Sequence, residues 1–455
     1  MSVPPNPAAA ARPRARRPIL WDVIREHLEE AAFLWRQRER SLRSPDYTLA
    51  DVAEGDEARL LAHVDGLEIG GLPVAERLLI PAVRGEGEPG QVGPAALALL
   101  ASRERDFTGA LLDLLPEGPE DSRSALRTAF EWSGREGLDA ALLRALGRAE
   151  PPTQAFLLEV LSFRQVALGD VLERLSVVED PALFAAALRA ARFAARPWAV
   201  ALVQGALEDT RPRVRSAALE TGLVLGLRRA WKACASLCRE PSADGRLARV
   251  ALALGGEAAE AQLLIKLLED DALRVEATWA LGFSGRRVAA DAVKETLAQG
   301  GGDRLAGEAF ALITGLPLER FLEPALEPGE EDGGDEAEGE SVTEENPRLP
   351  GPVLPPGKVQ VAAVEAWWQE TRPRLSERHR YLRGEPLTQE LLVDALLRGP
   401  MSERPSWALE LAVRSRGACF LELSALSARQ YRQLEAARAL NLGPMPRGFD
   451  GLLTQ

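Results

Sequence analysis

Aromatic residues make up only 5% of this 455-residue chain, and β-branched residues are also sparse, whereas helix-forming residues dominate. Strands draw heavily on both of the scarce types, so the composition argues against a β-rich fold and predicts an all-α protein. The chain is too long for one ordinary hydrophobic core, and we therefore expect a repeat array or two to three domains.

Thiol and imidazole groups are equally few. The three cysteines are an odd set that gives no disulfide framework and is consistent with a reducing, cytoplasmic location. Cys234 and Cys238 are spaced to share one helical face, but a closed zinc site needs four ligands and no others lie nearby. The three histidines, His27, His63 and His379, are widely separated. We therefore predict no metal site and no cofactor.

Motifs of common enzymes are also missing. The sequence has no phosphate-binding G-x-x-x-x-G-K-[ST] loop and no G-x-S-x-G nucleophile elbow, so we name no catalytic residue and expect a non-enzymatic protein. No apolar run approaches the roughly 18 residues of a membrane helix, which predicts no membrane insertion.

The net charge of −13 is concentrated in one place. Residues 323–346 hold eleven acids and no lysine or arginine, so the other residues together carry only −2. A nearly neutral body lacks the basic face that nucleic acid requires, and we expect no nucleic-acid partner. The acidic stretch has two interpretations, a solvated spacer or a mimic that docks on a basic partner.

What the sequence does contain is a repeat. Between about residue 120 and residue 315, a helix that carries small apolar residues recurs at intervals of 27 to 32 residues. A fixed period in this range predicts a solenoid, in which each unit buries its apolar face against its neighbours. The anchor positions of these helices are Ala129, Leu158, Ala187, Ala218, Val250, Ala277 and Ala309.

Acidic turns precede most of these helices and predict helix caps. Arg215 and Arg274 occupy the same place in two repeats. We expect Arg215 to pair with Asp209, and Arg274 to pair with Asp270 or Asp271.

Composition and helix signals divide the chain into six segments. These are a disordered basic arm (1–17), an N-terminal cap helix (18–48), a HEAT-like array (49–322), an acidic and proline-rich linker (323–357), a C-terminal helical domain (358–443) and a tail (444–455). Within the C-terminal domain we expect helices over 358–371, 388–397, 403–414 and 428–440.

The repeat pattern D…VR..A…(A)LG resembles HEAT repeats, particularly the short form of phycobilisome-lyase-like proteins. Other features resemble a family of proteobacterial HEAT-repeat proteins to which no enzymatic activity is assigned. They are the opening Ile19-Leu20-Trp21-Asp22, the pair Trp367-Trp368, Arg380-Tyr381-Leu382 with Gly384 and Pro386, and 408–412. Genes of that family often lie beside type VI secretion components, so the resemblance implies spike or effector proteins as partners.

Exposed side chains on the anchor helices are candidates for protein binding, because these helices line the concave face of HEAT-type solenoids. Trp279, Arg249 and Glu276 are the candidates in the regular C-terminal repeats, and Trp367 and Trp368 are those in the C-terminal domain. The alternative for each tryptophan is packing between uneven repeats.

The function that we expect is a non-catalytic scaffold for protein–protein interaction, and the resemblance implies an accessory or effector-loading role in type VI secretion. The first alternative is a bilin-lyase-like enzyme, which would need a polar cleft with convergent acid and base groups. A second alternative is a structural spacer.

Overall fold

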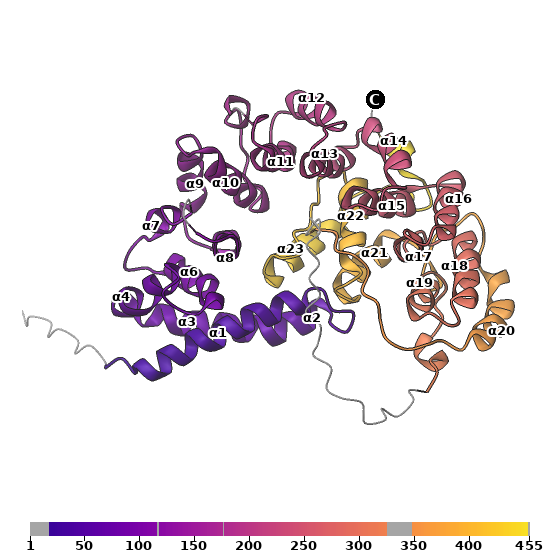
Figure 1. The fold of residues 1–455 in the computed structure, drawn as a ribbon, viewed down its shortest axis with the longest axis horizontal. Coiled ribbons are helices and arrows are strands. Elements are labelled where there is room, and N and C mark those ends of the chain that lie inside the picture. Colours follow the sequence, from indigo (N-terminus) through magenta and orange to yellow (C-terminus); the bar gives the residue numbers. More distant parts are fainter. Residues whose placement is uncertain (1–17, 116–117, 176, 325–347, 454–455) are drawn as a thin grey trace, which may run out of the picture.

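A computed structural model describes residues 18–115, 118–175, 177–324 and 348–453. Helices predominate in the described chain and strands are almost absent from it, which confirms the predicted all-α class. Helices follow one another around an arc, and the last three helices of the chain lie within that arc rather than beyond its end (Figure 1).

The bounds of the elements follow the predicted pattern closely. Before the acidic stretch the α-helices are α1 (Trp21–Ser41), α2 (Leu49–Val52), α3 (Ala58–Ile69), α4 (Gly71–Val74), α5 (Ile80–Val83), α6 (Val92–Ala101), α7 (Thr108–Leu112), α8 (Glu120–Trp132), α9 (Leu138–Leu146), α10 (Pro151–Phe163), α11 (Pro181–Ala190), α12 (Arg196–Ala206), α13 (Pro212–Val224), α14 (Arg228–Leu237), α15 (Ala243–Gly255), α16 (Ala258–Lys266), α17 (Arg274–Gly282), α18 (Arg287–Gln299) and α19 (Arg304–Thr314). After it come α20 (Val361–Thr371), the strands β1 (Tyr381–Leu382) and β2 (Glu385–Pro386), α21 (Gln389–Arg398), α22 (Arg404–Arg414) and α23 (Ser427–Arg438). Short π-helical turns are η1 (Ala53–Glu57) and η2 (Ala75–Leu79), and short 3-10 turns are η3 (Pro89–Gln91), η4 (Leu172–Arg174), η5 (Ala191–Phe193), η6 (Leu267–Glu269), η7 (Leu318–Phe321), η8 (Arg372–Arg374) and η9 (Phe449–Leu452).

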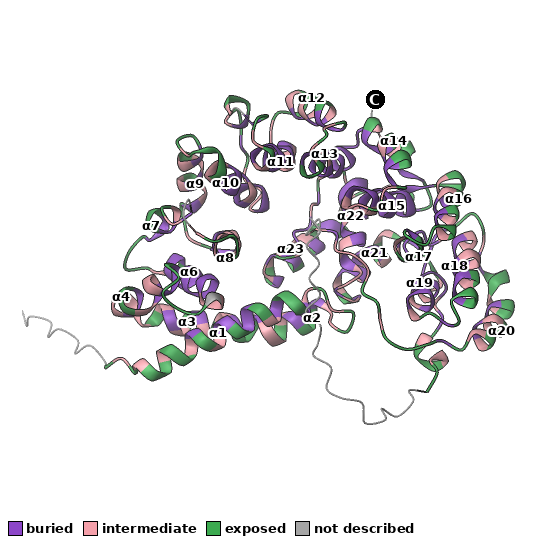
Figure 2. Ribbon diagram, viewed as in Figure 1, coloured by how far each residue is buried: buried purple, intermediate pink, exposed green. Residues whose placement is uncertain are grey.

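The anchor residues of the repeat all lie on one row of stacked helices. Its seven anchor residues fall in turn on α8, α10, α11, α13, α15, α17 and α19, and all of them are buried. From α10 onward, each of these helices contacts the next one in the row. We call this row the inner helices, because α13 and α15 contact α22 inside the arc and Figure 2 shows them largely buried. Small anchors allow this close stacking.

The acidic turns act partly as predicted. Asp180 caps α11, its carboxylate accepting from the backbone N–H of Leu183 at 2.7 Å. Arg274 pairs with Asp271, as expected. The expected pair of Arg215 with Asp209 was wrong. Asp209 instead accepts from the guanidinium of its near neighbour Arg211, at 2.7 Å, and Arg215 reaches forward to Asp244 on α15 at 2.6 Å.

A β-hairpin with two residues in each strand precedes α21, α22 and α23. Strands β1 and β2 pair antiparallel, and the turn residues Arg383 and Gly384 both have positive φ. This is the backbone of a tight hairpin turn, for which glycine is well suited. The turn donates to the C-terminal end of α19, from the Arg383 N–H to Leu312 O at 2.6 Å and from the Gly384 N–H to Ile313 O at 3.0 Å.

Arg380 attaches residues 348–453, which we call the C-terminal segment, to the array. Arg380 is 2% exposed, and its guanidinium donates to two backbone carbonyls at the end of α17, Phe283 O at 3.1 Å and Ser284 O at 2.9 Å. The same guanidinium binds the buried Glu410 on α22, which also accepts from Arg414 at 2.8 Å. Helix α22 is thereby fixed against the inner side of the arc.

A second attachment joins the N-terminal helices to the same segment. Arg38 on α1 is buried, pairs with Glu57 at 2.9 Å, and donates to Ala425 O at 2.9 Å. Glu57 in turn accepts from the backbone N–H of Ser427 at 2.8 Å. The C-terminal segment therefore bridges the two ends of the arc.

The predicted tail is anchored as far as residue 453. Phe449 is fully buried and lies edge-on to Trp231 of α14, with ring centroids 5.7 Å apart. A side chain at Gly255 of α15 would overlap the Phe449 ring. The expected basic arm (1–17) and the acidic part of the expected linker (325–347) lie outside the described residues, whereas residues 348–350 lie inside the arc.

These contacts predict that the two parts of the chain assemble without a covalent link. Residues 1–324 and 348–455, co-expressed as separate chains, should co-elute as one particle. Replacing Arg380 by Ala in the second chain should weaken the assembly, because it leaves Glu410 buried with less compensation, at a cost of about 3–5 kcal/mol. The measurement is size-exclusion chromatography with light scattering. Two separate folded peaks from the native pair would contradict the prediction.

Candidate functional site

The arc and the C-terminal segment enclose a cavity of about 730 Å³. Its walls come from α1, from the inner helices α8, α10, α11, α13 and α15, from α22, and from the non-helical stretches 348–350 and 420–424. We call this space the central cavity. Its volume lies in the range of ligand sites of known proteins, which are about 300–1,000 Å³.

The lining combines charged and apolar side chains in similar numbers. Seven of the lining residues are arginines and five are glutamates, and thirteen are apolar, among them Phe163 and Phe420. The arginines are Arg36, Arg40, Arg43, Arg127, Arg189, Arg348 and Arg404, and the glutamates are Glu39, Glu131, Glu159, Glu220 and Glu422.

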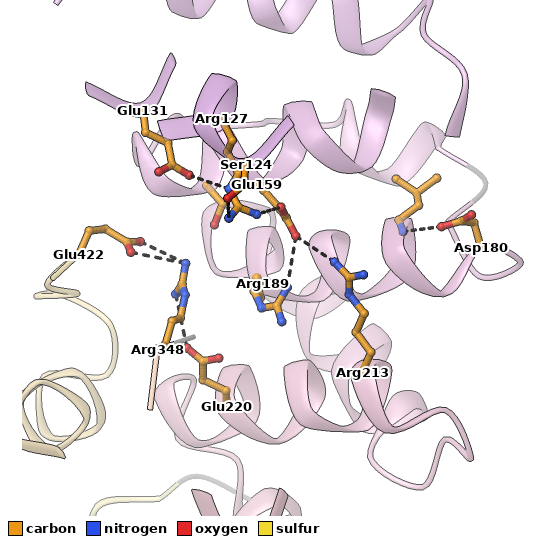
Figure 3. A network of polar contacts seen from close by, with 12 residues as sticks. Ser124, Arg127, Glu131, Glu159, Asp180, Arg189, Arg213, Glu220, Arg348 and Glu422 are labelled. Atoms are coloured by element: carbon orange, nitrogen blue, oxygen red, sulfur yellow. Dashed lines mark hydrogen bonds and ion pairs between the residues drawn. The ribbon is translucent and has the colours of Figure 1, made fainter. Parts of the chain in front are cut away.

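Four of these residues form a ladder of alternating charge across consecutive inner helices. Arg127, Glu159, Arg189 and Glu220 are separated by 32, 30 and 31 residues, which is the repeat itself. Each therefore lies within two residues of the anchor of its helix, one step further along the array. Glu159 lies between its neighbours, 2.7 Å from Arg127 and 3.6 Å from Arg189 (Figure 3).

Arg348 extends the ladder from the inner helices to the C-terminal segment. It lies 3.4 Å from Glu220 on α13 and 3.4 Å from Glu422, and Figure 3 shows it between the two. Glu422 also pairs with Arg192 of η5 at 3.0 Å, and the Arg192 guanidinium stacks on the Phe420 ring at 3.5 Å. The ion pairs along the described cavity wall thus form two groups, one centred on Glu159 and one that joins Arg348 to Glu220 and Glu422.

The network holds two glutamates in opposite protonation states. Burial by itself would raise the pKa of Glu159, but Arg127, Arg189 and Arg213 outweigh burial and hold its pKa below the ordinary value. Burial raises the pKa of Glu131 to about 8, since Arg127 compensates only partly and Glu422 and Glu159 add repulsion. At neutral pH Glu131 is therefore largely protonated while Glu159 is ionised.

One wall of the cavity is a stretch of backbone that the array holds like a bound peptide. Residues 420–426 are not helical, and side chains of three array helices or loops donate to their carbonyls. Gln165 donates to Phe420 O at 2.7 Å, and Trp132 donates to Ser424 O at 3.0 Å. Together with Arg38, these donors recognise main-chain atoms, which every polypeptide has.

The predicted binding residues lie elsewhere, near the other end of the array. Trp279 is half-buried, and its ring lies edge-on to Phe283, which in turn lies edge-on to Trp407 of α22. Arg249 is 1% exposed, donates to Cys238 O at 2.8 Å and pairs with Glu276. Arg249 is therefore an interior residue, not the exposed one that was expected, and Glu276 is its partner.

The tryptophan pair of α20 is likewise engaged. Trp368 is buried and donates to Asp291 of α18 at 2.9 Å, while Trp367 is half-buried and stacks on it with ring centroids 6.4 Å apart. Both rings pack against Phe310 of α19. They join α20 to the end of the array.

Sequence reasoning missed the charged ladder, although its period was visible. The repeat was followed through its small apolar anchors, and the charged residues near them at positions 127, 159, 189 and 220 were not considered. Their alternating sign and their spacings of 32, 30 and 31 residues are the signal that could have found them.

Comparison with known proteins finds no protein-family model and no curated protein that matches the sequence.

Among the described residues, no three His, Cys, Asp or Glu side chains are grouped as a metal site would require. Within the same residues, no helix combines the length and apolar character needed to cross a membrane.

The protonation of Glu131 leads to a stability prediction. Its pKa rises on folding from 4.5 to about 8, so the stability it contributes is present below pH 4.5 and is lost as the pH rises towards 8. Glu131→Gln should remove this loss and raise the melting temperature at pH 7 to 8, by the equivalent of up to about 3 kcal/mol. The gain should be much smaller at pH 5.

The matched control is Glu159→Gln. Because the pKa of Glu159 is lowered in the fold, its charge stabilises the protein above its ordinary pKa, and this substitution should lower the melting temperature across pH 5 to 8. Equal pH profiles for Glu131→Gln and the native protein would show that Glu131 ionises normally.

Trp279 is predicted to act through packing. Trp279→Ala should destabilise the protein by about 3 kcal/mol, because it removes the ring that supports Phe283 against α22. Phe33→Ala, at a side chain 49% exposed on α1, is the control and should have little effect. Thermal melting decides between them. A native melting curve for Trp279→Ala would leave its ring free for a partner.

Proposed function

We propose that this protein is a non-catalytic scaffold that binds a segment of another polypeptide in the central cavity. The observation that carries the proposal is the way the array holds residues 420–426, through donors aimed at backbone carbonyls. These donors are engaged with residues 420–426 and are not among the residues that line the cavity, so a second polypeptide would contact the charged and apolar side chains of the lining.

The shape of the site supports the same function. The cavity lies along several inner helices rather than at one point, so its walls contact a ligand over the length of an array. Elongated ligands suit such a surface, because each repeat adds one more set of contacts. The family resemblance supplies the expected partner class, effector or spike proteins of type VI secretion, and an accessory role in their loading is part of this proposal.

The bilin-lyase-like enzyme is the second candidate, and one observation favours it. Glu131 is an acid that stays protonated at neutral pH, and it lies 3.8 Å from Arg127 within a polar cavity. A polar cleft of that kind was what this alternative required. The scaffold remains the better proposal, because the cavity walls are committed to ion pairs and main-chain recognition.

Filling the cavity should abolish partner binding. Thr128 lines the cavity on α8 and is half-buried, so Thr128→Trp should occupy the space that a bound segment needs. Ile69→Trp, at a side chain 85% exposed, is the control. Tagged native protein should recover a partner from its host, the control should recover it equally, and Thr128→Trp should not.

Two results would contradict the scaffold. The first is equal recovery of that partner by Thr128→Trp, provided that its melting temperature shows that it is folded. The second is a coloured tetrapyrrole that copurifies with the native protein in place of a polypeptide, which would favour the lyase-like alternative.

A further inference from the structure

The central cavity has a basic edge on α1. Arg36 and Arg40 are spaced by four residues and so lie on one face of the helix, and Arg43 follows one turn later, just after the helix ends. All three are exposed and all three line the cavity. We call these three residues the basic rim.

Within the described part of the chain, Arg36 and Arg40 form no ion pair, in contrast to Arg127 and Arg189 deeper in the wall. Glu39, which lies between them, is the acid on this stretch of α1. The rim therefore keeps an excess of positive charge at the entrance to the cavity.

The net charge of the whole cavity lining is also positive. Seven arginines face five glutamates, and Glu131 is largely protonated at neutral pH, so the ionised groups leave a net positive interior. This excess is local, because the protein as a whole has a net charge of −13. A positive cavity in a negative protein selects for a ligand with carboxylates and draws it towards the entrance.

On this basis we propose that the segment bound in the central cavity is acidic, and that the basic rim recognises carboxylate side chains on alternate residues. This inference rests on the proposed function. The spacing supports it, because four residues of helix rise about 6 Å between Arg36 and Arg40. Two residues of an extended peptide span about 6.7 Å, so side chains that point to the same side meet both guanidinium groups. Arginine binds carboxylates through paired hydrogen bonds.

A nucleic acid is a poorer occupant. Five glutamates line the same cavity, and the ladder places Glu159 and Glu220 in its wall, where a phosphate backbone would meet repulsion at regular intervals. A peptide meets this wall with N–H donors as well as carboxylates, and so matches both signs of charge.

The test uses the full-length protein and three fluorescent twelve-residue peptides of equal length. One alternates Glu with Ser, one alternates Lys with Ser, and one alternates Gln with Ser. Fluorescence anisotropy should show binding of the Glu peptide at least about tenfold tighter than that of the Gln peptide. Its affinity should fall several-fold between about 50 and about 300 mM NaCl, because exposed charges are screened.

Charge reversal of the basic rim locates the effect. The triple variant R36E/R40E/R43E should lose at least about tenfold in affinity for the Glu peptide and leave binding of the Gln peptide unchanged. The matched control reverses three exposed arginines outside the cavity, R103E/R174E/R229E, and gives the same change in net charge. The control should stay within about twofold of the native affinity, and melting curves establish that both variants are folded.

Each contrary outcome is distinct. Equal binding of the Glu and Gln peptides would overturn the acidic preference and leave the proposed function intact, whereas recovery of the host partner by Thr128→Trp would overturn the function itself. Tighter binding of an oligothymidylate than of the Glu peptide would overturn the peptide assignment. The protein's own acidic stretch, 323–346, is the competing occupant, because in the sequence it comes shortly before Arg348, which lines the cavity. If the Glu peptide binds only after those eleven acids are replaced by Gln, the proposal of an external acidic partner is wrong.

Discussion

The buried charge cluster of Arg380, Glu410 and Arg414 determines where the C-terminal segment lies. Burial alone would raise the pKa of Glu410, but the two guanidinium groups hold it below the ordinary value, so the carboxylate stays ionised with almost no contact with water. Such a cluster is tolerated only when every partner is in place, since one unpaired buried charge costs several kcal/mol. Arg380 also satisfies carbonyls at the end of α17, and so one side chain couples helix termination, ion pairing and docking of α22.

The rest of the central cavity follows from that docking. Helix α22 supplies one wall, and the chain that leaves it, residues 420–426, supplies the next before reaching α1. The concave side of the solenoid is consequently partly filled by the C-terminal segment, which leaves a cavity between the two. A binding site on this protein is therefore built jointly by the array and by the segment that follows it in sequence.

Local sequence predicted the helices well, because their signals are local. The anchor period identified the inner helices, and Thr388 was correctly expected to begin a helix, its side chain accepting from the Leu391 N–H at 3.1 Å. The docking of the C-terminal segment was not predictable in this way. Arg38 meets Ala425 across 387 residues of sequence, and no periodic pattern connects the two.

The candidate site was missed for a related physical reason. A charged residue that faces an internal polar cavity gives the same local pattern as one that faces bulk water, with apolar neighbours at helical spacing on the opposite side. Glu159 and Arg189 therefore give the same sequence pattern as solvent-facing residues of amphipathic helices. Arg249 illustrates the converse, because its burial depends on carbonyls at Cys238 and Glu240 that only the folded turn presents.

The alternating ladder gives the array a reason to keep charges in its interior. Buried ion pairs contribute little net stability compared with apolar residues of similar size, so stability does not explain them. They do fix register, because sliding one inner helix along the next would separate Glu159 from Arg127 or from Arg189. They also place charges in a cavity whose remaining lining is largely apolar. A wall that sets the order of the repeats and presents both charged and apolar groups is a structure suited to receiving a ligand.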